Sequence, residues 1–186
     1  MNVFILAASA QGASINKKLA VAIGNLITAE GAHTLDIPDF KDFTLPMYDG
    51  DTEQESGVPA LAKSLAERIE KADAVIICTP EYNGSIPGSL KNTLDWLSRL
   101  RPHPLVAKPV LLTGASPGGL GAIRGLWHTR VPFEALGALV YPEMFGLSGA
   151  YEAFDEQGAF KDSRKAEQVN KLVHTFLGFA AAVSKA

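Results

Sequence analysis

The sequence predicts an α/β domain in which a parallel sheet is covered by helices on both faces. Three observations predict it: five short apolar runs of strand length, helical periodicity between them, and a length of 186 residues, which suits one domain over 1–186. Parallel strands need crossover connections, which the helical segments supply. Ligands are therefore expected at the carboxyl ends of the strands, near a switch point in strand order.

The first half of the chain contains three of the predicted strands. The run VFILAA (3–8) leads through a loop of small residues into a helix, and HTLDI (33–37) is a shorter second strand. Residues 38–59 have no clear periodicity and are predicted to form a long loop, of a kind that is usually functional or mobile. A helix opened by Pro59 then precedes the third strand, 72–79.

The second half alternates in the same way. The expected elements are a helix over 86–100, a strand over 108–116, a helix over 119–136, a strand over 137–141 and an amphipathic helix from Asp162 onward. Pro132 falls inside the second of these helices and should kink or interrupt it, because proline removes an N–H donor and clashes with the preceding turn.

The composition favours a small-molecule partner in the cytoplasm. A formal charge of −3 gives no strong attraction to nucleic acid or to an anionic membrane. The one cysteine, Cys78, excludes an internal disulfide and indicates a reducing compartment. The apolar run at the N-terminus lacks a basic flank, so it is interpreted as a strand rather than a signal peptide, and no run approaches the ~20 apolar residues of a membrane span.

The loop ASAQGASIN (8–16) joins the first strand to a helix and suits an anion. Free backbone N–H groups at a helix start, the positive end of the helix dipole and short hydroxyl side chains together favour a phosphate. The glycine patterns of dinucleotide-binding and nucleotide-hydrolysing loops are both absent here. The alternative is that Ser14 simply caps the helix and the rest is a turn.

The loop after the fourth strand contains GASPG (114–118), which matches the G-x-S-x-G nucleophile elbow of hydrolases. A triad would be completed by His128 or His174 together with Asp155 or Asp162. Against a hydrolase, Pro117 has no N–H to donate to an oxyanion. The other interpretation is that Gly118, Gly119 and Gly121 let the backbone approach a flat ring closely.

The stretch CTPEYNGSIPGSLKN (78–92) follows the third strand with an acid, a phenol and an amide. Glu81 is a lone carboxylate, which is a weak catalytic signal. The four histidines lie far apart in the sequence, so no metal site is predicted. The planar and hydrogen-bonding groups of the loop suit the polar edge of an aromatic cofactor.

Taken together, the loops resemble those of the NAD(P)H-dependent FMN reductase family, flavodoxin-like flavoproteins that include quinone, chromate and azo-dye reductases. The resemblance rests on four segments: ILAASAQGASINKKL, LPMYDGD (45–51), TPEYNGSIPGSLKNTLDWLSR (79–99) and GASPGGLGAIR (114–124). It implies a flavodoxin-like, five-stranded sheet of order 2-1-3-4-5. It also implies an FMN-containing oxidoreductase that takes electrons from NADH or NADPH and reduces quinones, chromate, ferric complexes or azo dyes.

The resemblance also implies cofactor-binding residues in three groups. Those around the FMN phosphate are Ser9, Gln11, Ser14, Ile15 and Asn16. Those along the isoalloxazine and ribityl are Pro80, Glu81, Tyr82, Asn83 and Gly84. Those beside the pyrimidine ring are Ser116, Pro117, Gly118 and Gly119. No catalytic side chain is expected, since the cofactor carries the chemistry.

In such an enzyme a hydride passes to flavin N5 and an acceptor later uses the same place, which predicts ping-pong kinetics. The helix beginning near Ser85 is expected to pack on another subunit of a homodimer or homotetramer. One departure concerns the GSxR pattern usual in the first loop: this chain has Gln11 in place of the arginine. Two alternatives follow: FMN binds more loosely, or Lys17, Lys18 or a residue of the partner subunit compensates for the missing charge. The alternative from another class is a flavodoxin-like electron carrier with no substrate of its own.

Overall fold

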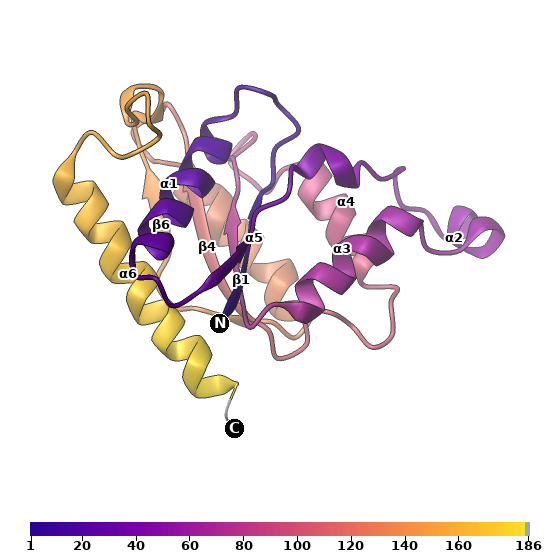
Figure 1. Ribbon diagram of the computed structural model, residues 1–186. Helices are drawn as coiled ribbons and strands as arrows, with labels where there is room; N and C mark the ends of the chain where they lie inside the picture. Colours follow the sequence, from indigo (N-terminus) through magenta and orange to yellow (C-terminus); the bar gives the residue numbers. More distant parts are fainter. Residues whose placement is uncertain (185–186) are drawn as a thin grey trace.

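A parallel sheet of six strands forms the centre of the molecule in the computed structural model, which describes residues 1–184 (Figure 1). The strands are β1 (Asn2–Ala7), β2 (Thr34–Asp36), β3 (Ala74–Cys78), β4 (Pro109–Ala115), β5 (Leu139–Val140) and β6 (Phe145–Leu147). Their order is β2-β1-β3-β4-β5, with β6 also paired to β4. The predicted flavodoxin-like class and strand order are therefore confirmed, and the sixth strand is an addition.

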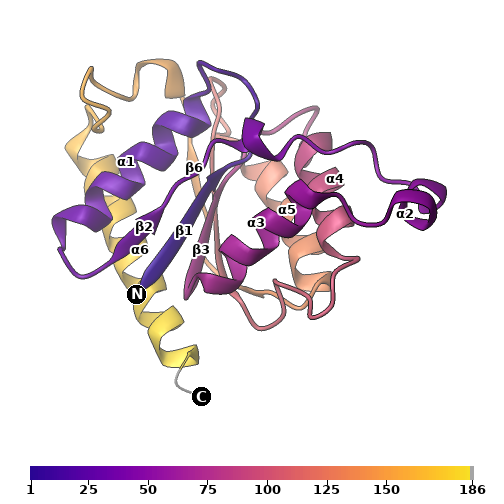
Figure 2. The same cartoon turned by 45° about the vertical axis from the view of Figure 1, so that its right-hand side comes forward.

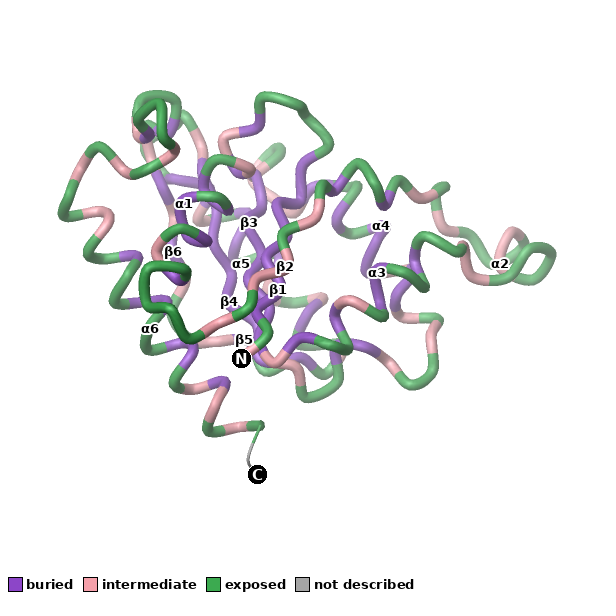
Figure 3. The backbone as a smooth tube through the Cα atoms, viewed as in Figure 1, coloured by how far each residue is buried: buried purple, intermediate pink, exposed green. Residues whose placement is uncertain are grey.

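Helices cover both faces of this sheet (Figure 2). On one face lie α1 (Ile15–Ala29) and α6 (Ser163–Val183), and on the other lie α3 (Ala60–Lys71), α4 (Gly88–Leu97) and α5 (Ile123–Ala135). Successive residues of β1 alternate between the two cores, as the period of a strand requires: Ile5 packs under α1 and Phe4 under α3. The central strands β1, β3 and β4 are accordingly buried along most of their length (Figure 3).

The last strand position of the sheet is divided in two. β5 pairs with the start of β4, at Pro109 and Val110, whereas β6 pairs with its end. Pro142 lies in the gap and has no N–H for a ladder. The guanidinium of Arg130 donates instead to the carbonyl oxygens of residues 140–142, at 3.0–3.4 Å. The predicted strand 137–141 thus survives only as β5, and β6 was missed because three residues with a central glycine carry little strand signal.

The prediction of an unbroken loop over 38–59 was wrong. The segment contains a short 3₁₀ helix, η1 (Phe40–Phe43), and the helix α2 (Gly50–Ser56), which projects from the body of the molecule in Figures 1 and 2. The carbonyl oxygen of Pro46 accepts hydrogen bonds from Asn92 Nδ2 (2.9 Å) and Trp96 Nε1 (2.8 Å). These two α4 residues are four positions apart and so lie on one helix face. That face fastens the segment to the body.

Two other expectations need correction. Helix α5 continues through Pro132 to Ala135 and is not interrupted: the proline lacks only its own N–H, and its carbonyl oxygen still accepts the Leu136 N–H at 3.2 Å. Helix α4 begins at Gly88 rather than at 86, directly after Pro87. Helix α6 does follow Asp162, whose carboxylate accepts the N–H of Arg164 at 2.9 Å. Within residues 1–184, no helix combines the length and the apolar character that crossing a bilayer requires.

Candidate functional site

A pocket of about 330 Å³ lies at the carboxyl ends of β1, β3 and β4, where the three loops singled out in the sequence meet. Predicted site residues that line it are Ser9, Gln11, Ser14, Ile15, Asn16, Pro80, Glu81, Tyr82, Ser116 and Pro117. Predicted residues outside its lining are Asn83, Gly84, Gly118 and Gly119. Lining residues that sequence reasoning missed are Ala13, Ala115 and Tyr151.

The loop after β1 offers hydrogen-bond donors that the described protein does not use. Ser14 caps α1: its backbone is extended and its Oγ accepts the Asn16 N–H at 3.2 Å. Within residues 1–184, the backbone N–H groups of Gly12, Ala13 and Ile15 have no protein acceptor. These donors, the hydroxyl of Ser9 and the helix dipole all suit the same ligand, an anion. Capping by Ser14 and anion binding are therefore compatible.

Asn16 links this loop to the next strand. Its Oδ1 accepts the Ala115 N–H at 2.8 Å, and its Nδ2 donates to the Ala115 carbonyl oxygen at 3.0 Å. The residue is 1% exposed, so this double hydrogen bond joins the start of α1 to the end of β4 inside the protein. One amide N–H remains for other use. Asn16 therefore holds two walls of the pocket together.

The carboxylate of Glu81 in the loop after β3 is bound by the protein itself. Glu81 Oε1 accepts from the guanidinium of Arg124, and Oε2 accepts the Gly125 N–H at 3.1 Å. Burial raises the pKa of this carboxyl, but the Gly125 N–H and the Arg124 charge outweigh that effect and hold the pKa below its usual range. An ionised, fully bonded carboxylate ties the loop to α5 and is not free for acid or base work.

The rest of this loop is a tight turn. Tyr82 and Ser85 exchange backbone hydrogen bonds at 3.0–3.1 Å around Asn83 and Gly84. Both central residues have positive φ, 52° and 75°, which asparagine and glycine adopt at the least cost. Tyr82 remains 52% exposed on the pocket side of the turn.

The loop after β4 does not assemble a hydrolase site. Ser116 Oγ accepts the Gly118 N–H at 3.2 Å. His128 Nδ1 lies 2.9 Å from Ser85 Oγ, and His174 Nδ1 lies 3.6 Å from the carboxylate of Glu30. In the described structure, Asp155 and Asp162 accept backbone N–H groups of their own turns. The triad of the hydrolase alternative is thus not formed.

Tyr151 reaches the pocket from the short helix η2 (Ala150–Glu152). Two backbone hydrogen bonds fix that helix beside the third loop: Ser116 N–H to the Leu147 carbonyl oxygen and Ala150 N–H to the Ser116 carbonyl oxygen. Tyr151 comes near the other loops because β6 brings η2 back to the edge of the sheet. Since β6 was not predicted from the sequence, Tyr151 was not predicted as a site residue either.

The chemistry of the pocket fits FMN. Its first loop supplies hydroxyl and N–H donors for a phosphate, and the rest of its lining includes two tyrosines, Tyr82 and Tyr151, which suit contact with a planar ring. Within residues 1–184, no cluster of histidine, cysteine, aspartate or glutamate side chains could hold a metal ion.

Comparison with known proteins decides the family, because residues 1–152 match the profile described as NADPH-dependent FMN reductase. The chain belongs to this family. Over 112 residues it is 48% identical to a quinone reductase of Escherichia coli, a match that covers 59% of this chain and 58% of that protein. It is 31% identical to a 2-hydroxy-1,4-benzoquinone reductase of Burkholderia sp over 98% of this chain and 95% of that one.

A solved structure supports the same family. The flavoenzyme NAD(P)H:acceptor oxidoreductase FerB of Paracoccus denitrificans superposes with a TM-score of 0.84 at 29% identity, covering 97% of each chain. The resemblance inferred from the loop motifs is confirmed.

Proposed function

We propose that the protein is an NAD(P)H-dependent flavin oxidoreductase that binds FMN in this pocket and reduces a small acceptor such as a quinone. One observation carries the proposal: in a chain of this family, the three loops meet around N–H and hydroxyl donors that are free to bind a phosphate. The quinone reductases among its relatives favour a quinone over chromate, ferric complexes or azo dyes. When bound, FMN supplies the redox chemistry by accepting a hydride from NADH or NADPH and passing electrons on.

The role of the chain's own residues is to bind the cofactor and to orient its ring. The hydroxyls of Ser9 and Ser14 and the N–H groups of Gly12 and Ala13 would hold the phosphate. The turn at 80–85 and the loop at 116–119 would flank the ring. Because Glu81 is ionised and bonded to Arg124, it orients the turn and moves no proton.

The first test is the purified protein itself. We expect a yellow protein that releases FMN on denaturation, oxidises NADH or NADPH with a quinone, and gives the parallel double-reciprocal lines of a ping-pong mechanism. A protein that binds FMN without oxidising either nicotinamide would be the electron carrier. A colourless protein with esterase activity lost in Ser116→Ala would be the hydrolase.

We also propose a homodimer in the cytoplasm. The outward face of α4 carries the Lys91–Asp95 ion pair (2.6 Å), whereas α5 exposes Trp127 (56%) and Val131 (66%) four residues apart. This favours an interface on α5 rather than on α4, the helix named by the sequence prediction. The buried thiol of Cys78 suits a reducing compartment.

The dimer has a direct test in solution. Light scattering should give twice the chain mass for the wild type and the mass of one chain for Trp127→Glu. Val106→Glu, which also charges an exposed apolar site, should stay dimeric. A monomeric wild type would refute the dimer, and a dimeric Trp127→Glu protein would move the interface away from α5.

A further inference from the structure

The phosphate loop of this chain contains no cation. Residues 8–16 read ASAQGASIN, with Gln11 where the family pattern has arginine. A phosphate monoester carries about −1.5 to −2 charges at neutral pH. Neutral donors and the helix dipole can hold this anion, but they give it no full opposite charge, so a cation from another part of the chain would strengthen FMN binding here.

Two basic side chains near the pocket, Lys17 and Arg124, are already engaged. Lys17 Nζ lies 2.7 and 2.8 Å from the two carboxylate oxygens of Asp39, and this pair is neutral as a whole. Arg124 across the pocket is bound to Glu81. Both of these cations are thus held by carboxylates.

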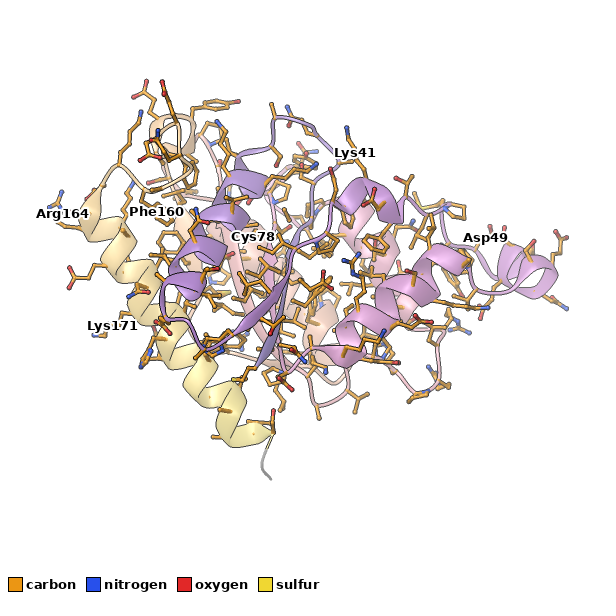
Figure 4. All side chains as sticks on the ribbon, in the orientation of Figure 1. Lys41, Asp49, Cys78, Phe160, Arg164 and Lys171 are labelled. Atoms are coloured by element: carbon orange, nitrogen blue, oxygen red, sulfur yellow. The ribbon has the colours of Figure 1, made fainter. Side chains whose placement is uncertain are left out.

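Lys41 is the cation that reaches the loop from outside it. Its Nζ lies 3.9 Å from the point where a β-carbon on Gly12 would stand, and it has no carboxylate partner within residues 1–184. Figure 4 shows Lys41 on η1, beside the loop that follows β1. Gly12 has no side chain, which leaves the space between the ammonium group and the loop backbone open.

The base of Lys41 is fixed although its side chain is exposed. Its N–H donates to Asp39 Oδ1 at 3.0 Å, and its neighbours Phe40 and Phe43 are buried at 4% and 3% exposure. A cation on an anchored backbone, beside a loop with free N–H groups, is arranged as an anion site requires.

We propose that Lys41 provides the counter-charge for the flavin phosphate in this chain, in place of the arginine that Gln11 replaces. This inference rests on the proposed function, since it concerns the same pocket. It assigns a binding role to a residue outside the three loops.

The experiment compares two ligands that differ only in the phosphate. Apoprotein is titrated with FMN and with riboflavin, and flavin fluorescence is followed at low salt for the wild type, Lys41→Ala, Lys41→Arg and Lys18→Ala. Lys171→Ala, on the far face of α6, is the matched control for loss of one exposed lysine. We expect Lys41→Ala to weaken FMN binding about tenfold and to leave riboflavin binding unchanged.

Rescue adds a second measurement. Lys41→Arg should keep most of the FMN affinity, and Gln11→Arg added to Lys41→Ala should restore it, because a charge on the loop replaces the one removed. Equal weakening of both ligands by Lys41→Ala, no weakening of FMN, or a larger loss in Lys18→Ala would overturn the inference. A wild type that shows no preference for FMN over riboflavin would instead refute the phosphate site and with it the proposed function.

Discussion

The loops after β1 and β3 are both polar and both line the pocket, but they use their polar groups differently. Donors of the first loop, such as the Gly12 and Ala13 N–H groups, are unused in the described structure. In the loop after β3, the polar groups are already hydrogen-bonded within the protein. Glu81 binds Arg124 and Gly125, and Ser85 bonds Tyr82 and His128. The first loop is thus built to receive a ligand and the second to be a fixed wall. Substitutions should separate these roles by affecting affinity in one loop and stability in the other.

The largest effect is expected at the link between the two walls. Asn16→Ala removes both hydrogen bonds to Ala115 and leaves a buried N–H and a buried carbonyl oxygen unpaired. The free energy of unfolding should fall by about 2–4 kcal/mol, measured by urea denaturation. Asn25→Ala, on the exposed side of the same helix, is the control and should change it by less than ~0.5 kcal/mol. Equal effects would show that the link carries no stability.

Glu81, in the fixed wall formed by the loop after β3, should make a pH-dependent contribution to the free energy of unfolding. The pKa of Glu81 is lower in the folded protein than in the unfolded chain, so its ionised form adds stability above the unfolded value of about 4.3, and that stability is lost as the pH falls through the lower folded pKa. Glu81→Gln should cost about 1–2 kcal/mol at pH 7. The difference between variant and wild type should disappear in acid. A difference that stays constant down to pH 3 would contradict the ionic link.

Ser14 both caps helix α1 and lines the pocket, so its variants can separate an effect on stability from an effect on FMN affinity. Ser14→Ala loses the cap and should cost about 1 kcal/mol of stability. Ser14→Asp keeps a capping oxygen and restores that stability, but its negative charge should repel the phosphate and abolish FMN binding. Denaturation and FMN titration of both variants provide the check. Unchanged FMN affinity in Ser14→Asp would place the phosphate elsewhere.

The smallest change in stability is expected at Ser9. Its Oγ accepts only a long hydrogen bond from the Gln11 N–H, 3.4 Å, so Ser9→Ala should alter the free energy of unfolding by less than ~0.5 kcal/mol. Its FMN affinity should nevertheless fall about fivefold, the equivalent of one neutral hydrogen bond. Riboflavin affinity should stay constant. A loss of stability without a loss of affinity would assign Ser9 to the fixed wall.

The sequence predicted the architecture well because the strands are continuous apolar runs and the loop motifs are specific. What it missed depended on contacts between distant segments. The pairing of Asn16 with Ala115 spans 99 positions, and the anchoring of Pro46 by Asn92 and Trp96 joins a weakly periodic segment to a distant helix. The sequence prediction gave Glu81 no catalytic role, but its partner Arg124 could not be identified from the lone carboxylate.

The divided strand position has a consequence for how this chain meets other chains. One border of the sheet is broken at Pro142 and its carbonyl oxygens are occupied by Arg130. The opposite border is β2, only three residues long, with Asp36 paired to Arg68 at 2.6 Å. Neither border offers the long row of free backbone groups on which a further strand could grow. Fibril-like stacking is therefore disfavoured at both ends, and self-association is left to the helices.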